Sequence, residues 1–251
     1  MAQTPAPALP PHTIRRSARA RRARLTVTRE GELVVTLPRR APERAAALLV
    51  AEHLDWVHAQ LGRVAATRRR LDERLPLLGG RHLVVNGIPH SVRLADPARD
   101  PGAGRRAGVE RHLASDADGL TGELVVDPGR SGRDPATLVE DWLRAEARRV
   151  IEGRVAARAP GMAVTPARIT IRAQQTRWGS ASHDGSLSFN WRLLLAPPYV
   201  LDAVVVHELA HLRARGHGAA FWAIARQHAP RTNEARAWLK VHHAELLAAL
   251  D

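Results

Sequence analysis

The stretch His207-Glu208-Leu209-Ala210-His211 decides the fold, and His217 follows it six residues later. On a helix, two histidines four positions apart lie one above the other on the same face. Both imidazoles can then bind one Zn²⁺, and the glutamate between them lies close enough to act as a general base. Gly216 allows a sharp turn at the end of the helix, which would bring His217 back as a third ligand. The stretch therefore predicts a catalytic metal site.

An amphipathic helix with surface histidines is the competing explanation for this motif. The apolar segment before the motif and the third histidine after a glycine make a chance match several-fold rarer. The spacing from His207 to His217 matches the metzincin pattern, but Ala214 stands where metzincins have glycine. Zn²⁺ is the expected metal, although three histidines would also hold Ni²⁺, Co²⁺ or Cu²⁺.

The expected chemistry follows from three neutral imidazoles, which leave the metal doubly charged with an open fourth position. A water molecule bound there would have its pKa lowered toward ~7. Glu208 would take a proton from this water as it attacks a peptide carbonyl, and would then pass that proton to the leaving amine.

The C-terminal third resembles the YgjP-like metallopeptidases, small bacterial zincins related to the SprT and WLM groups. The segments that carry the resemblance are Arg177-Trp178-Gly179-Ser180, Leu187-Ser188-Phe189-Asn190-Trp191-Arg192-Leu193, Ala196-Pro197-Pro198, Val204 to Leu212, His217-Gly218 and Phe221-Trp222. The resemblance is dense from about residue 169 to 239 and looser before that. Members often have cysteine after the R-W-G-S run, where this chain has Ala181. The resemblance implies a zinc peptidase in which His207, His211 and His217 match the metal ligands and Glu208 matches the catalytic acid/base.

Composition narrows the class of protein. The 251 residues suffice for one large domain or two small ones with a sizeable core. There are no cysteines, which excludes disulfides and thiolate zinc sites. The Ala/Pro-rich N-terminus has no apolar signal region, and no run approaches the ~18 apolar residues that span a bilayer. We therefore expect a cytoplasmic protein with no membrane partner.

The net charge is +13, from 38 Lys and Arg against 25 Asp and Glu. The charge comes mainly from arginine, which clusters at Arg15-Arg16, 19–24, Arg39-Arg40 and 68–70. Such an excess favours polyanions, so nucleic acid is a possible partner. A merely solvated surface with biased composition explains the arginines equally well.

Local patterns predict an α+β chain of zincin type with an N-terminal β-hairpin and helix subdomain. Residues 1–13 are expected to be a disordered tail, 14–134 a β-rich subdomain with a flexible insertion at 96–122, and 135–251 the catalytic region. Hairpins are predicted at 24–37 and 81–94, the latter with Val84 and Val85 buried. A helix is predicted from Pro42 to about Leu71, with Leu48, Leu49, Leu54, Trp56 and Leu61 as core positions, and another from Pro135 to about Ala157. Further strands are predicted at 168–173 and 187–195, and helices at 199–211, 218–228 and 233–250.

Several further residues are candidates for contacts with a peptide or protein substrate. Arg177 could bind a carboxylate, Asn190 and Trp191 could reach the site, and Tyr199 could donate to an oxyanion; ion-pairing, capping and core packing are the alternatives. By analogy with zincins, the strand 187–193 is a candidate edge for pairing with the substrate backbone, although it could equally be a central strand. Asp202 and Glu234 are candidate hydrogen-bond partners of the ligand histidines.

Two functions remain open at this point. The first is a zinc-dependent peptidase, which Glu208 favours because a structural zinc site does not need a base and usually has four protein ligands. The alternative is a nucleic-acid-associated basic protein in which the metal site is structural or auxiliary.

Overall fold

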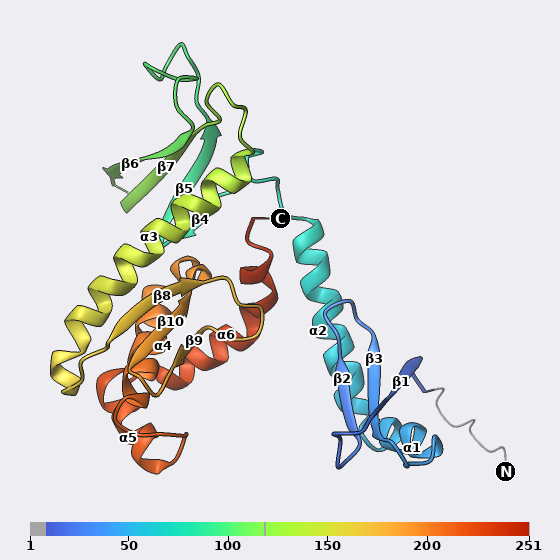
Figure 1. Ribbon diagram of the computed structural model, residues 1–251. Helices are drawn as coiled ribbons and strands as arrows, with labels where there is room; N and C mark the ends of the chain where they lie inside the picture. The colour runs from blue at the N-terminus through green and yellow to red at the C-terminus, as the bar shows by residue number, and fades with distance from the viewer. Residues whose placement is uncertain (1–8, 118, 251) are drawn as a thin grey trace. The chain divides into compact units, whose positions relative to one another are not determined.

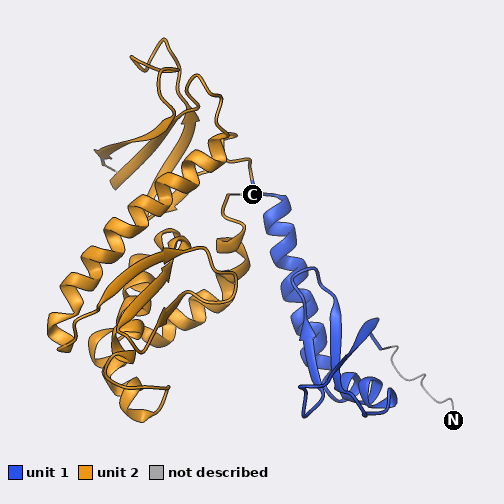
Figure 2. Ribbon diagram, in the orientation of Figure 1, with its two compact units in different colours: residues 1–74 blue, residues 75–251 orange. Residues whose placement is uncertain are grey.

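The computed structural model describes residues 9–117 and 119–250. The chain divides into two compact units, residues 1–74 and 75–251 (Figure 2). The secondary structure is mixed, with three small sheets and six α-helices in the described ranges, which confirms the predicted α+β class. Within the same ranges, no helix combines the length and the apolar character needed to cross a membrane.

The first unit is built on a three-stranded sheet. Its strands are β1 (His12–Ser17), β2 (Arg24–Val27) and β3 (Leu33–Pro38), in the order β1-β3-β2 (Figure 1). The predicted hairpin is confirmed by the antiparallel pairing of β2 with β3. The predicted tail is wrong at its end, because His12 and Thr13 pair in parallel with Leu33 and Val34. Residues 1–8 of that tail lie outside the described residues.

Two helices complete the first unit where the sequence predicted one. Helix α1 (Arg44–Glu52) and helix α2 (Leu54–Asp72) are separated by His53, whose φ of −116° and ψ of 27° are not helical. The buried positions are Ala46, Val50 and Val57. The predicted core positions Leu48 and Trp56 are 67% and 43% exposed, so the prediction is wrong for both. The other predicted positions, Leu49, Leu54 and Leu61, are half-buried.

The second unit begins with a four-stranded sheet in the order β4-β5-β7-β6. Its strands are β4 (Leu83–Val85), β5 (Ile88–Leu94), β6 (Gly108–Asp116) and β7 (Gly119–Asp127). The prediction of a flexible insertion at 96–122 is wrong from Gly108 onward, since β6 and β7 pair along their whole length as an antiparallel hairpin. Hydrophobic alternation missed this hairpin because Leu113 and Leu120 on it are exposed. In the β4–β5 hairpin Val85 is buried, but Val84 points to solvent, contrary to the prediction.

Helix α3 (Pro135–Arg158) joins this sheet to the rest of the unit. The Asp134 side chain caps its first turn by accepting a hydrogen bond from the Thr137 N–H at 2.9 Å. Pro135 follows the cap, where the sequence predicted that the helix begins. Leu138, Leu143 and Ile151 of α3 share one core with residues of the four-stranded sheet and of α4 (Pro198–His211), the helix that carries His207 and His211. The unit boundary therefore falls after residue 74, and not at the predicted 134.

A second sheet and three helices form the region that carries the histidines. Strands β8 (Arg168–Arg172), β9 (Gly179–Ala181) and β10 (Ser186–Asn190) are ordered β8-β10-β9. Strand β10 is thus central, and the predicted substrate-binding edge at 187–193 is wrong. A 3₁₀ turn at Trp191–Leu195 ends it early, because the Asn190 side chain caps that turn. Helices α4 (Pro198–His211), α5 (Ala219–His228) and α6 (Thr232–Leu247) follow; α4 is buried along most of its length.

Candidate metal centre and cleft

Three histidine side chains meet at the C-terminal end of α4. The Nε2 atom of His207 lies 3.3 Å from Nε2 of His211 and 3.1 Å from Nε2 of His217, and the ligand atoms all lie within 4.8 Å of one another. Two nitrogens bound tetrahedrally at ~2.0–2.1 Å from zinc would be about 3.3 Å apart. The donor set and the two distances from His207 therefore fit a zinc ion.

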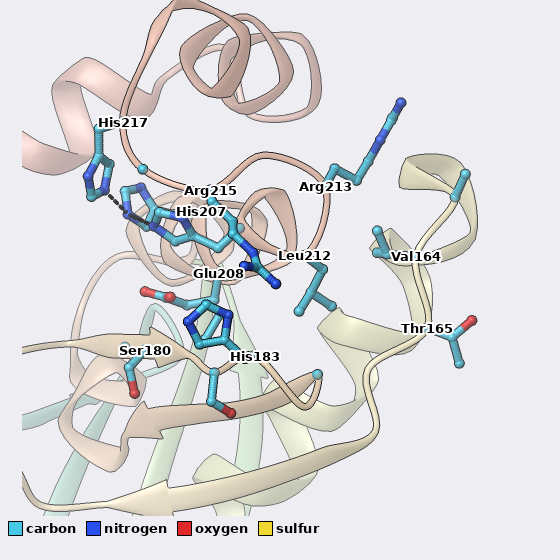
Figure 3. A pocket seen from close by; sticks show the side chains of 17 residues that line it. Val164, Thr165, Ser180, His183, His207, Glu208, Leu212, Arg213, Arg215 and His217 are labelled. Carbon is cyan, nitrogen blue, oxygen red and sulfur yellow. Dashed lines mark hydrogen bonds between the residues drawn. The ribbon is translucent and has the colours of Figure 1, made fainter.

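His217 reaches this position through the turn that the sequence predicted. Gly216 has a φ of +73°, a left-handed conformation that glycine adopts without strain. Figure 3 shows His217 pointing toward His207 from the loop after α4. His211 also hydrogen-bonds the backbone of Ala214, which is the kind of contact that orients a ligating imidazole.

Phe221 of α5 packs against all three imidazoles. Its ring centroid lies 4.8 Å from those of His207 and His217 and 4.4 Å from that of His211. The ring is buried. Sequence reasoning gave Phe221 no role at the site, although its position ten residues after His211, next to Trp222, was part of the family resemblance.

The environment of His207 and His211 favours their neutral forms. Burial lowers the pKa of His207 to about 4, and the neighbouring His211, His217 and Arg236 act in the same direction. Burial likewise lowers the pKa of His211. Neutral imidazoles have the free lone pair that a metal ligand needs.

Glu208 is buried beside the histidines, with 5% of its surface exposed. Burial raises the pKa of its carboxyl group to about 7, and Arg177 opposes this shift. The carboxyl group lies against the backbone of β9, where a Cβ on Gly179 would come within 2.5 Å of Oε1. Only a glycine at position 179 therefore leaves room for the carboxyl group in this place.

A cleft of about 790 Å³ opens in front of these groups. One side is the strand β9 with the turn after it, and the other is the C-terminal end of α4 with the loop that follows (Figure 3). His207, Glu208, His211 and His217 all line it. The cleft has the size of an ordinary small-ligand or peptide site, ~300–1,000 Å³.

The four further candidates do not gather at this cleft. Asn190 and Trp191 are fully buried, and the Asn190 amide donates to the Gln174 carbonyl at 2.6 Å while its Oδ1 accepts from the Arg192 N–H. Tyr199 lies under the Arg231 guanidinium, 3.6 Å from its ring centroid. None of the three lines the cleft. Of the four, only Arg177 influences the site, through its charge near Glu208.

The two predicted hydrogen-bond partners of the histidines are engaged elsewhere. The Asp202 carboxylate accepts from Nε of Arg158 at 2.9 Å, and Glu234 accepts from Nε of Arg231 at 2.8 Å. The contact at His211 comes from a backbone group instead, which a residue pattern cannot reveal.

Residues 21–242 match the sequence model of a family described as "YgjP-like, metallopeptidase domain". A comparison with curated proteins finds no match. Two solved structures are similar over 36% of this chain. The metallopeptidase zymogen abylysin of Pyrococcus abyssi is 19% identical over 90% of its own length, with a TM-score of 0.33. The metallopeptidase zymogen jannalysin of Methanocaldococcus jannaschii is 19% identical over 92%, with a TM-score of 0.32.

Proposed function

Because this chain belongs to the YgjP-like metallopeptidase family, we propose that it is a zinc-dependent peptidase in which Glu208 is the general base. The family makes the chain a metal-dependent hydrolase; the choice of zinc and the role of Glu208 are our proposal. The observation that carries it is the convergence of His207, His211 and His217, whose ligand atoms all lie within 4.8 Å of one another, beside a buried carboxyl group.

The chain's own residues have distinct tasks in this proposal. Bound zinc would supply Lewis acidity toward the peptide carbonyl and toward a water molecule. Glu208 would accept a proton from that water as the water oxygen bonds to the carbonyl carbon. It would then donate the proton to the leaving amine as the C–N bond breaks. A carboxyl pKa of about 7 suits both tasks near neutral pH, because the group can be found in either state.

Strand β9 replaces the predicted strand as our candidate for binding the substrate backbone. In the described part of the chain, Gly179, Ser180 and Ala181 pair with β10 on one side and have no strand on the other. Gly179 to Ala181 also line the cleft. An extended peptide added to this edge would be held by main-chain hydrogen bonds, which tolerate many sequences.

The decisive test combines metal content with activity. Zinc per chain is measured by elemental mass spectrometry on the wild type, His217→Ala, Glu208→Gln and the exposed control His58→Ala. Cleavage of a quenched-fluorescent peptide library is measured on the same samples. We expect about one zinc in all but His217→Ala, and cleavage by the wild type and His58→Ala only. Full zinc and full cleavage in Glu208→Gln would refute the role of the glutamate.

Nucleic acid remains a second candidate partner, for a specific topological reason. Strands β1 and β3 are parallel and β2 is antiparallel to β3. The ends of β1 and β3 and the start of β2 therefore meet at one edge of the sheet. Three of the predicted clusters come together there, and their side chains are exposed: Arg15, Arg16, Arg19, Arg21, Arg22, Arg24, Arg39 and Arg40. This concentration of charge suits a phosphate backbone.

Salt dependence tests this candidate. Binding of a labelled DNA duplex and of a structured RNA is measured between 50 and 200 mM salt for the wild type, for Arg19/Arg21/Arg22→Ala and for the distant triple Arg68/Arg69/Arg70→Ala. We expect affinity to fall steeply with salt and to depend on the first triple far more than on the second. Equal losses in both triples would indicate non-specific attraction to net charge.

The cytoplasm is our proposed compartment. A cysteine-free chain does not require an oxidising environment to fold, which supports the proposal. Cell fractionation with an antibody to the chain would test it.

A further inference from the structure

A second cavity lies behind the metal centre, between α4, α6 and the start of β9. Its volume is about 230 Å³. It shares three lining residues with the cleft, namely Gly179, His207 and Glu208. The remaining lining residues are Trp178, Ala203, Val204, Thr232, Ala235, Arg236 and Leu239. The cavity is therefore next to the metal centre and smaller than the ~300–1,000 Å³ of a site for a whole small ligand.

The walls of this cavity are mainly apolar. Ala203 and Val204 come from α4, and Ala235 and Leu239 from α6, and all four are buried. Trp178 forms another wall and is held edge-on against His243, with 5.3 Å between the ring centroids. Thr232 contributes a hydroxyl group, but this group already donates to the Ala229 carbonyl at 2.6 Å. An apolar side chain would thus pay little desolvation free energy on entering the cavity, whereas a charged side chain would find few hydrogen-bonding or ion-pair partners there.

One positively charged side chain, Arg236, lines the cavity but does not fill it. Arg236 is exposed, and its guanidinium lies over the Trp222 ring, 4.5 Å from the ring centroid. The only carboxyl group among the described lining residues is Glu208, which already serves the metal centre. The charge at the cavity therefore gives no reason to expect a basic side chain in it.

The position of β9 connects the cavity to the substrate. Trp178, just before this strand, lines the small cavity, while Ser182 and His183, just past its end, line the cleft. A peptide paired along β9 would run past both. One of its side chains next to the metal centre would then face the small cavity, and the rest of the peptide would occupy the cleft.

We propose that this cavity is a specificity pocket that receives a single uncharged apolar side chain, of about the size of leucine, from the substrate residue next to the cleaved bond. The proposal rests on the peptidase function proposed above and adds the substrate class. The small side chains of Ala203 and Ala235 leave space in the lining, and the larger side chains of Leu239 and Trp178 line the same cavity. Ala235 is only 1% exposed, so a larger residue there would project into the pocket.

Two readouts test the pocket, one of them without catalysis. The first is the binding of N-acetyl-leucine hydroxamate and N-acetyl-glycine hydroxamate to zinc-loaded protein by titration calorimetry. The hydroxamate group anchors both probes on the zinc, so they differ only in the side chain offered to the pocket. The second is the cleavage profile of a peptide library randomised at the residues on both sides of the cleaved bond. Both are measured on the wild type, on Ala235→Leu and on the matched control Ala237→Leu, whose side chain is exposed on the same helix.

We expect the leucine probe to bind the wild type roughly tenfold to hundredfold more tightly than the glycine probe, as burial of one apolar side chain implies. Ala235→Leu should abolish this ratio, and Ala237→Leu should keep it. The library should show a preference for leucine-like residues on one side of the bond. Whether this preference lies before or after the cleaved bond would show whether the peptide runs antiparallel or parallel to β9.

The outcomes separate the pocket from the peptidase function. Equal binding of the two probes to the wild type would overturn the pocket, even if peptides are cleaved. A clear leucine preference that Ala235→Leu removes, with no peptide cleaved, would overturn the peptidase function and leave the pocket in place. If Ala235→Leu does not fold, the comparison of the two probes on the wild type still decides.

Discussion

Gly179→Ala should disable the site while leaving its metal in place. A Cβ at this position would lie 2.5 Å from Oε1 of Glu208, 2.7 Å from its Cγ and 2.8 Å from its Cδ. Ordinary van der Waals contact begins at 3.4 Å, so the carboxyl group must retreat by about 0.9 Å, or β9 must move by as much. A misplacement of ~1 Å at a catalytic group can cost about 100-fold in rate. We therefore expect kcat to fall about 100-fold.

The assay separates this effect from unfolding and from metal loss. Peptide cleavage, zinc content and urea denaturation are measured on the wild type, Gly179→Ala and the control Gly153→Ala. A Cβ on Gly153, in the exposed part of α3, would meet nothing within 4 Å. We expect unchanged zinc in both variants, a loss of about 1–3 kcal/mol in the free energy of unfolding for Gly179→Ala from overpacking, and unimpaired cleavage in the control. Wild-type kcat in Gly179→Ala would refute the reasoning that the glycine positions Glu208.

Three further perturbations have defined outcomes. Glu146 accepts hydrogen bonds from Arg149 at 2.7 and 2.8 Å and from Arg111 at 2.9 Å, and its pKa is lowered below the ordinary 4.5, first by Arg149. Its contribution to stability is therefore present above pH ~4.5 and lost as the pH falls through the lowered pKa; acid titrations of unfolding should be steeper for the wild type than for Glu146→Gln, and identical curves would contradict this. Asp202→Asn should lower the free energy of unfolding by about 1–2 kcal/mol in urea, because the buried carboxylate loses its bond to a partly exposed Arg158; a change below ~0.5 kcal/mol would count against it. Zinc at 100 times Kd should stabilise the folded chain by about 2.7 kcal/mol, so chelation of the metal should lower Tm by roughly 5–10 °C. Calorimetric scans that coincide with and without the chelator would show that the folded chain does not bind zinc.

The histidine site was predictable because its parts are close in the sequence. The four-residue spacing of His207 and His211 fixes their common face once the segment is helical. The turn at Gly216 is equally local, since its φ of +73° is a property of that residue. The cap of α3 at Asp134 and the hairpin of β2 with β3 depend on neighbouring residues in the same way.

Other parts of the site depend on contacts between segments far apart in the chain. Strand β9 has three residues, too few to show a period, and it exists because β10 offers a partner. The contact of Gly179 with Glu208 joins residues 29 positions apart, so the reason for the glycine is invisible in the sequence. The same holds for the small cavity, whose walls come from α4, α6 and the residue before β9.

The sequence by itself determined the α+β class, the three candidate ligands and the candidate base, because helix periodicity and turn chemistry act over a few residues. The tertiary structure alone decided which strand forms the edge of the sheet, how deeply Glu208 is buried and where the unit boundary lies. Only the tertiary structure showed that residues 108–127 form a hairpin. Some apolar side chains of this hairpin are exposed, and its pairing rests on backbone hydrogen bonds. Backbone pairing and burial depend on contacts between segments that are far apart in the chain. The sequence pattern predicts such contacts only where the buried face of an element is apolar.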